Sequence, residues 1–324
     1  METRPMDLTP APYFRDIADG PEGGEAHWVT TKDGLRIRVG HWLPDGLPRE
    51  AIKGTVLIFP GRTEYIEKYG PAAIDLGRRG FATLAVDWRG QGLADRMLDD
   101  RRLGHVQHFP DFQQDVAAVV QLAQQLDLPK PWFLLAHSMG GAIGLRALIE
   151  GLPVKACAFT GPMWGIQIPA AMRPVARILG ALAPHLGFSA MRAPTTTKGH
   201  YVQSAPYEGN TLTNDADMYR FMQEQLEAQP DLTLGGPTVH WLSEGLQECA
   251  ALAQRPSPAL PCITFLGSDE QIVNTDAIKD RMQRWPGGEL DLVQGAQHEV
   301  VMEGPAIRQH TFDRMCALFD QYRG

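Results

Sequence analysis

Short apolar runs alternate with amphipathic segments along most of the chain. Apolar residues at helical spacing follow each run, as Phe112, Val116 and Val119 show. A strand that is buried on both faces has a continuous apolar sequence, so this pattern predicts a mostly parallel sheet with helices on both faces. The runs that predict the first buried strands are Thr55–Phe59, Ala82–Val86 and Trp132–Ala136.

The beginning of the chain has a different pattern. Residues 1–25 are polar, rich in proline and glycine, and without periodicity, which predicts a loosely ordered N-terminal segment. The alternating runs His27–Thr30 and Leu35–Trp42 then flank Asp33 and Gly34. An Asp-Gly pair between two strand-like runs predicts a β-hairpin.

Three further runs, Val154–Phe159, Cys262–Leu266 and Leu290–Val293, predict the remaining strands, and a final helix should begin at Pro305. About a hundred residues of different character separate the first two runs. Within them, residues 164–237 contain short helical patterns that are broken by prolines and rich in aliphatic side chains. This composition favours an inserted helical cap over a pocket, although a plain structural subdomain would look similar. We therefore expect residues 26–163 and 238–324 to form the core, and residues 164–237 the cap.

The composition excludes some classes of function. The 324 residues carry a net charge of -8 with a pI near 5.7, so no basic stripe is available for nucleic acid. No apolar run approaches the roughly 20 residues that span a bilayer, and residues 1–20 lack the basic patch followed by an apolar stretch that is typical of a signal peptide. We expect a cytoplasmic protein without an integral membrane segment, which leaves room for a transient contact with a membrane surface. The oligomeric state does not follow from the sequence.

The most specific chemical signal is a turn around Ser138, which follows a predicted strand and opens a predicted helix. This is the context of a nucleophile elbow, in which the strand turns so sharply that small residues are needed two positions before and after the serine. Ala136 and Gly140 meet that need. The alternative is a serine that only caps its helix.

The partners of a nucleophilic serine follow it in the order acid, then histidine, in folds of this kind. His298 lies just beyond the last predicted strand, which makes it the candidate base. The loop after Cys262–Leu266 offers two adjacent carboxylates, Asp269 and Glu270. Either could orient and stabilise the imidazole, so side-chain type does not choose between them.

An oxyanion hole requires two backbone N–H groups. Met139, the residue after the serine, should supply one, and Arg62 in the loop Pro60–Gly61–Arg62 should supply the other. A tight turn without function is the alternative for this loop. We expect no cofactor, because no complete phosphate-binding glycine motif is present, and no metal, because His105 and His108 lack a third ligand.

These segments together resemble the bacterial lysophospholipase and monoacylglycerol lipase branch of the α/β-hydrolases, within the wider serine aminopeptidase group. The segments that carry the likeness are Phe59–Glu64 with Lys68 and Tyr69, Asp87–Gly92, His137–Gly141, and Gly267–Val273 with His298. The resemblance implies the α/β-hydrolase fold. It also selects Glu270 as the acid, because the family acid stands three residues after the loop glycine, although aspartate is commoner there.

The function that we expect is a serine hydrolase that cleaves a carboxylic ester of a lysophospholipid or monoacylglycerol through an acyl-enzyme. A serine aminopeptidase is the nearest rival, because carboxylates in the insertion could bind a free amino group. A non-catalytic member that binds a ligand in the pocket is the rival from another class. The carboxylates in question are Asp215, Asp217, Glu224 and Glu227.

Overall fold

The computed structural model describes residues 8–167, 188–194, 196 and 199–323. Residues 1–7 of the predicted N-terminal segment, and 168–187, 195 and 197–198 of the predicted cap, lie outside the described residues. Within the described ranges, none of the helices is long and apolar enough to cross a membrane.

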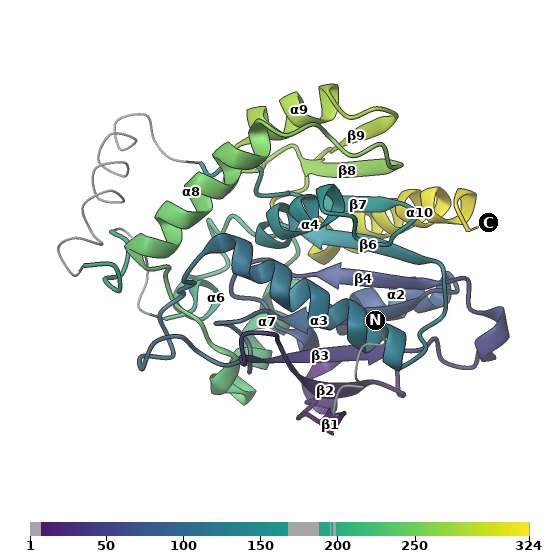
Figure 1. Cartoon of the computed structure of the whole chain (residues 1–324), viewed down its shortest axis with the longest axis horizontal. Coiled ribbons are helices and arrows are strands. Elements are labelled where there is room, and N and C mark those ends of the chain that lie inside the picture. Colours follow the sequence, from purple (N-terminus) through teal and green to yellow (C-terminus); the bar gives the residue numbers. More distant parts are fainter. Residues whose placement is uncertain (1–7, 168–187, 195, 197–198, 324) are drawn as a thin grey trace.

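The described residues form one nine-stranded sheet, in the order β1-β2-β3-β5-β4-β6-β7-β8-β9 (Figure 1). Strands β1, β2, β3 and β5 pair antiparallel in turn, and every later pair, from β5–β4 to β8–β9, is parallel. The predicted mostly parallel sheet is therefore confirmed. The strands are β1 Thr9–Pro10, β2 Glu25–Thr30, β3 Arg36–Trp42, β4 Thr55–Phe59, β5 Ala82–Asp87, β6 Trp132–His137, β7 Cys157–Thr160, β8 Cys262–Gly267 and β9 Gly288–Val293.

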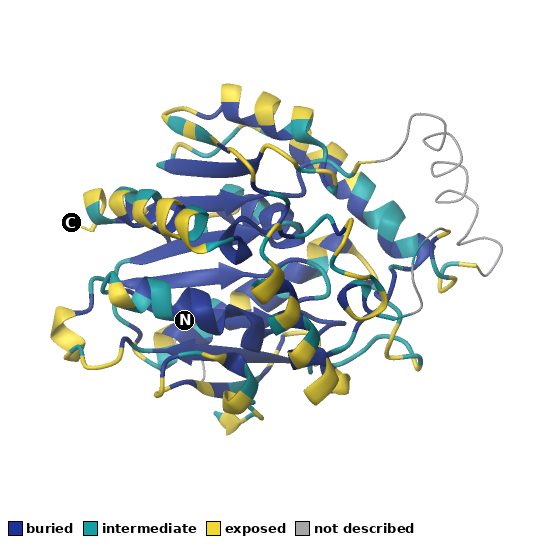
Figure 2. Cartoon of the chain, turned by 180° about the vertical axis from the view of Figure 1, so that it is seen from behind, coloured by how far each residue is buried: buried dark blue, intermediate teal, exposed yellow. Residues whose placement is uncertain are grey.

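Helices cover both faces of this sheet. Helices α2 and α10 pack on one face, while α3, α4, α8 and α9 pack on the other (Figures 1 and 2). Their bounds are α2 Gly70–Arg78, α3 Phe112–Gln125, α4 Met139–Ile149, α8 Val239–Ala253, α9 Thr275–Gln283 and α10 Pro305–Gln321. Short 3-10 helices occur at η1 Arg49–Ala51, η2 Ile66–Tyr69, η3 Phe109–Asp111, η5 Pro230–Leu232 and η6 Val300–Met302.

Neighbouring residues of one strand pack into different hydrophobic cores, one on each face of the sheet. In β4, Leu57 and Phe59 join the core beneath α3 and α4, whereas Val56 and Ile58 join the core beneath α2 and α10. All four side chains are fully buried. Successive strand side chains point to opposite faces, so a strand covered on both sides must be apolar at every position. This double burial is the reason why the central strands could be read from the sequence.

Residues 8–24 have defined structure, which the sequence pattern did not predict. Strand β1 pairs with β2, and the short helix α1 (Arg15–Ala18) follows it. The Nη1 atom of Arg38 in β3 donates a hydrogen bond of 2.9 Å to the Pro12 carbonyl. A two-residue strand is too short to show a period, so this part of the chain is ordered by contacts with distant residues.

The described part of the insertion contributes α6 (Tyr201–Ser204) and α7 (Ala216–Ala228). These helices have a small core of their own, which includes Tyr65 from the sheet domain. The Tyr65 hydroxyl donates to Gln225 Oε1 at 3.0 Å, and Gln225 Nε2 donates to the Ile17 carbonyl at 2.8 Å. The insertion is thus attached to the core near the pocket, and its predicted limits, 164–237, stay a prediction. The buried members of this small core are Tyr65, Val202, Tyr219, Met222, Leu226 and Leu232.

Candidate active site

Ser138 lies at the sharp turn between β6 and α4. Its φ of 49° and ψ of -117° lie in a region that residues other than glycine rarely adopt. Its side chain makes no capping hydrogen bond to α4, although it occupies the capping position. This backbone strain and the free hydroxyl are typical of a nucleophile elbow and argue against a serine that only caps its helix.

The small residues around Ser138 are required by close packing. A Cβ atom at Gly140 would overlap the carbonyl oxygen of Phe59, so a larger residue would push α4 away from β4. Ala136, which replaces the usual glycine of this motif, faces Gly144. A Cβ at Gly144 would lie only 3.2 Å from the Ala136 Cβ. The extra methyl group at 136 is tolerated because its helical neighbour has none.

His298 and Glu270 form a buried pair. The Nδ1 atom of His298 lies 2.6 Å from Glu270 Oε2, and the two side chains are only 4% and 1% exposed. Glu270 Oε1 also accepts hydrogen bonds from the backbone N–H groups of Ile272 at 2.6 Å and Val273 at 3.2 Å. Burial by itself would raise the pKa of Glu270. The hydrogen bond and charge of His298 and these backbone donors outweigh it, so the pKa is lowered.

The neighbouring carboxylate, Asp269, points elsewhere. It is exposed, and its Oδ1 accepts a hydrogen bond of 3.0 Å from the Ser268 hydroxyl. The structure therefore brings Glu270, and not Asp269, into contact with His298.

The predicted oxyanion loop packs directly against Ser138. A Cβ at Gly61 would lie 3.1 Å from the Ser138 Cβ. Among the described residues, the backbone N–H groups of Arg62 and Met139 have no hydrogen-bond partner. Arg62 follows the glycine that packs on Ser138, and Met139 follows Ser138 itself, so these two N–H groups are candidates for the donors that an oxyanion requires.

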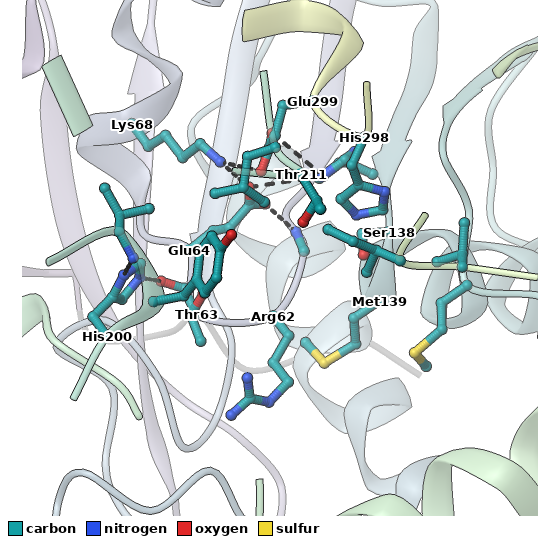
Figure 3. A pocket seen from close by; sticks show the side chains of 18 of the residues that line it. Arg62, Thr63, Glu64, Lys68, Ser138, Met139, His200, Thr211, His298 and Glu299 are labelled. Carbon is teal, nitrogen blue, oxygen red and sulfur yellow. Dashed lines mark hydrogen bonds and ion pairs between the residues drawn. The ribbon is translucent and has the colours of Figure 1, made fainter. Parts of the chain in front are cut away.

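Ser138, His298, Arg62 and Met139 all line one pocket with a volume of about 400 Å³. In the close-up of Figure 3, His298 lies on the same side of the pocket as Ser138, and the Arg62 side chain extends away from both. Glu270 lies behind His298, since it contacts the imidazole and is not itself part of the pocket wall.

A buried charge cluster, consisting of Glu64, Lys68, His137 and Glu299, forms the adjacent wall (Figure 3). Lys68 Nζ donates to Glu64 and, at 2.6 Å, to Glu299 Oε1. His137 Nε2 faces Glu299 Oε2 at 3.4 Å. Glu64 also accepts the backbone N–H of Gly61. The cluster thus joins the oxyanion loop to the residue that follows His298.

The charges of this cluster stabilise one another. Burial alone would lower the pKa of His137, but the carboxylates of Glu299 and Glu64 outweigh it and raise that pKa. Burial alone would raise the pKa of Glu299, but Lys68 and His137 hold it well below its usual range. Both carboxylates are therefore compensated by cations inside the protein.

Among the residues that the structure describes, two groups of side chains have the composition of metal ligands. Glu64, His137 and Glu299 converge within the charge cluster, but the Lys68 ammonium already lies between the two carboxylates. The other group lies on the β2–β3 hairpin, away from the pocket, and consists of Glu25, His27 and His41.

The chain was compared with known proteins. A family model described as "Serine aminopeptidase, S33" matches residues 50–305. The chain belongs to this family of hydrolases. Lysophospholipase L2 of Escherichia coli K12 is 34% identical to the hydrolase over 280 residues, which are 82% of this chain and 80% of the relative. A probable lysophospholipase L2 of Haemophilus influenzae is 25% identical over 306 residues, with 92% and 95% of the two chains covered.

The fold of the hydrolase is also that of solved structures. A soluble variant of monoglyceride lipase from Saccharomyces cerevisiae, in complex with a substrate analog, superposes with a TM-score of 0.70. The match covers 99% of this chain and 98% of the yeast chain, at 20% sequence identity. The predicted α/β-hydrolase fold and the predicted family are both confirmed.

Sequence reasoning missed the buried charge cluster of this hydrolase. Glu64 and Lys68 stand four residues apart next to the oxyanion loop, a spacing that favours an ion pair on a helical turn. Glu299 gives no such signal, because its partner Lys68 is 231 positions away in the chain. Only the fold brings these residues together.

Proposed function

We propose that this hydrolase cleaves the acyl ester of a lysophospholipid or monoacylglycerol, with Ser138, His298 and Glu270 as its catalytic triad. The observation that carries the proposal is the 2.6 Å contact between His298 Nδ1 and Glu270 Oε2. His298 lines the same pocket as Ser138, whose backbone is strained and whose side chain does not cap α4. The relatives named above are lysophospholipases, the similar yeast structure is a monoglyceride lipase, and the chain is a carboxylic ester hydrolase, as predicted from its sequence.

The proposed mechanism has two acyl-transfer steps. Glu270 fixes His298 with Nδ1 protonated, which leaves Nε2 as the base for the Ser138 hydroxyl. The serine oxygen attacks the ester carbonyl, and the N–H groups of Arg62 and Met139 stabilise the oxyanion. His298 returns the proton to the departing alcohol. Water then attacks the acyl-enzyme with His298 again as base, and the fatty acid leaves.

The lining of the pocket supports an acyl chain as the bound group. A volume of about 400 Å³ lies within the range of small-molecule sites, and nine of the described residues that line the pocket are apolar. They come from both the core and the insertion. These apolar residues are Met139, Met163, Ile166, Val202, Leu212, Met222, Trp241, Ile272 and Val273.

The aminopeptidase alternative needs a carboxylate that is free to bind an ammonium group. None of the four insertion carboxylates expected to do so lines the pocket. Asp215 caps α7 by accepting from the Met218 N–H, and Asp217 pairs with Arg220 on the surface. The carboxylates that do reach the pocket, Glu64 and Glu299, are already paired with Lys68. The pocket is therefore better suited to an ester than to a free amino terminus.

A fluorophosphonate probe tests the mechanism directly. The wild-type protein should be labelled covalently, and Ser138→Ala should not be labelled. Failure to label the wild type, or equal labelling of both proteins, would reject Ser138 as a nucleophile and with it the triad. The same outcome would favour a non-catalytic ligand-binding role.

A substrate panel tests the lipid assignment. Wild-type protein should hydrolyse a lysophospholipid and a monoacylglycerol of equal chain length, and should leave aminoacyl amides intact. Turnover confined to the amides would favour the aminopeptidase. The cytoplasmic location and a transient contact with a membrane surface stay predictions from the sequence.

A further inference from the structure

The side chain of Arg62 is unusual among the cations of the pocket. Its guanidinium lies over the Trp241 ring, with Cζ 5.4 Å from the ring centroid, and its Nη2 donates to the Gly235 carbonyl. Gly104 makes room for it, since a Cβ there would approach Nη2 to 2.9 Å. The guanidinium is thus held in place by an aromatic face and two loops, at a distance from Ser138 and His298 (Figure 3).

This guanidinium has few partners. Arginine carries five N–H donors, yet the Gly235 carbonyl is the only acceptor for Arg62 among the described residues, and its buried Nε has no partner. By contrast, buried Arg38 pairs with the carboxylates of Glu67 and Asp87. Burial without a carboxylate lowers the pKa of Arg62 to about 10, so the group remains charged at neutral pH. A largely desolvated charge with unused donors is costly unless an anion binds to it.

The other basic residues of the described pocket wall are already engaged or neutral. His137 faces Glu299 and the Thr160 carbonyl, and His298 contacts Glu270. Lys68 is occupied by Glu64 and Glu299. His200 faces the Thr63 carbonyl with Nε2 and accepts a backbone N–H with Nδ1. Burial lowers the pKa of His200 to about 4, so it is neutral near pH 7. Arg62 is therefore the cation of the described pocket wall that can pair with a ligand.

We propose that the Arg62 guanidinium is an anion subsite that binds the phosphodiester of a lysophospholipid head group. This inference rests on the proposed function, because it requires the acyl ester to be held at Ser138. A guanidinium presents a planar fork of N–H donors that matches two phosphate oxygens. Arg62 would then bind the substrate at two points. Its backbone N–H would donate to the carbonyl oxygen, and its side chain would bind the phosphate.

The lengths of substrate and side chain agree with this assignment. In a 1-acyl glycerophospholipid, the acyl carbonyl carbon and the phosphorus are six bonds apart, which is about 7 Å when extended. The arginine Cα and Cζ atoms are five bonds apart, or about 6 Å. The Arg62 backbone lies in the oxyanion loop against Ser138, and its side chain extends away from Ser138 and His298 (Figure 3). A carbonyl at the oxyanion hole would therefore place the phosphate within reach of the guanidinium.

Arg62→Met tests the subsite while keeping the backbone N–H. Two substrates of equal, short acyl chain are compared below their micellar concentrations, namely a lysophosphatidylglycerol and a monoacylglycerol. The ratio of their kcat/KM values should fall about tenfold or more in Arg62→Met, and by less in Arg62→Lys. Any disturbance of the oxyanion hole cancels in this ratio, because both substrates use the same hole. Arg102→Met is the charge-matched control, since Arg102 is exposed and paired with Asp100, and it should leave the ratio unchanged.

Equal losses on both substrates in Arg62→Met would overturn the subsite and leave the proposed function standing. Absence of turnover and of fluorophosphonate labelling in the wild type would instead overturn the proposed function.

A measurement that needs no variant is competitive inhibition of monoacylglycerol turnover by glycerophosphoglycerol, which should exceed inhibition by glycerol at least tenfold. Equal inhibition by these two compounds would overturn the subsite. Inhibition by inorganic phosphate as strong as that by glycerophosphoglycerol would overturn its assignment to the substrate head group.

Discussion

The two walls of the pocket are built in different ways. The sheet-side wall holds Ser138 and His298 on loops that follow strands, and its charge cluster pairs Lys68 with Glu64 and Glu299. The wall from the insertion includes apolar residues such as Val202, Leu212 and Met222, two of which are buried members of the small core around Tyr65. Hydrogen bonds and ion pairs fix positions within a few tenths of an ångström, whereas apolar contacts mainly exclude water and fill volume. We therefore expect substitutions on the sheet side to affect catalysis or folding strongly, and those on the insertion side to adjust binding.

The largest expected effect on catalysis is at Glu270, the proposed acid of the triad. Glu270→Gln should reduce kcat by on the order of 10⁴-fold, because a neutral amide cannot hold His298 in the required tautomer or stabilise its charged form. Asp269→Asn is the matched control and should change kcat by less than about twofold, since Asp269 is exposed and contacts Ser268. Steady-state kinetics on a soluble ester measures both. A larger loss at Asp269 would show that the wrong carboxylate has been assigned.

The next largest effect should be at the centre of the buried charge cluster. Lys68→Met leaves the carboxylates of Glu64 and Glu299 without their shared cation, and this should cost about 3–5 kcal/mol of unfolding free energy. Urea denaturation measures the change. Lys279→Met, at an exposed position of α9, is the control and should stay within about 0.5 kcal/mol of the wild type. Equal stabilities of the two variants would mean that the ion pairs of Lys68 do not stabilise the fold.

A smaller effect should appear in the pH dependence of stability. The folded-state pKa of His137 is raised above its ordinary value of 6.5, chiefly by Glu299 and Glu64 against the opposing effect of burial. The protonated form therefore stabilises the fold fully below pH 6.5, and this contribution is lost as the pH rises through the folded-state pKa. Thermal unfolding between about pH 6 and pH 9 should show this decrease in the wild type. His137→Asn should have a flatter profile over the same range, and an unchanged slope would contradict the assignment.

The smallest effect is expected in the insertion wall. Leu212→Ala removes part of the apolar surface of the pocket and should raise KM for a medium-chain ester by a few fold, because lost burial weakens ground state and transition state alike. The value of kcat should stay within about twofold of the wild type. Comparing KM across acyl-chain lengths checks this, with the greatest change for the longest chain. A large loss of kcat would show that this wall also takes part in positioning the reacting groups.

Some parts of the site could be predicted from the sequence, and others could not. Ser138 stands directly after an apolar strand, and His298 follows the last predicted strand after the short loop 294–297, so their placement follows from the strand pattern. Asp269 and Glu270 are adjacent on one loop, and the chemistry of their side chains is equivalent. The choice between them depends on which carboxylate the turn after β8 directs toward a histidine 28 positions later.

By itself, the sequence determined the mostly parallel character of the sheet, the alternation of strands and helices along the chain, and the turn that presents Ser138. These features follow from local patterns, because burial on both faces requires continuous apolar strands and a sharp turn requires small residues. The residue chemistry left the acid open and only the resemblance favoured Glu270, whereas the tertiary structure shows that Glu270 contacts His298. Only the tertiary structure shows how Lys68 joins Glu64 to Glu299, and that the Arg62 guanidinium lies over Trp241. Each of these is a contact between residues from separate segments, and its energy depends on burial and distance that no local pattern encodes.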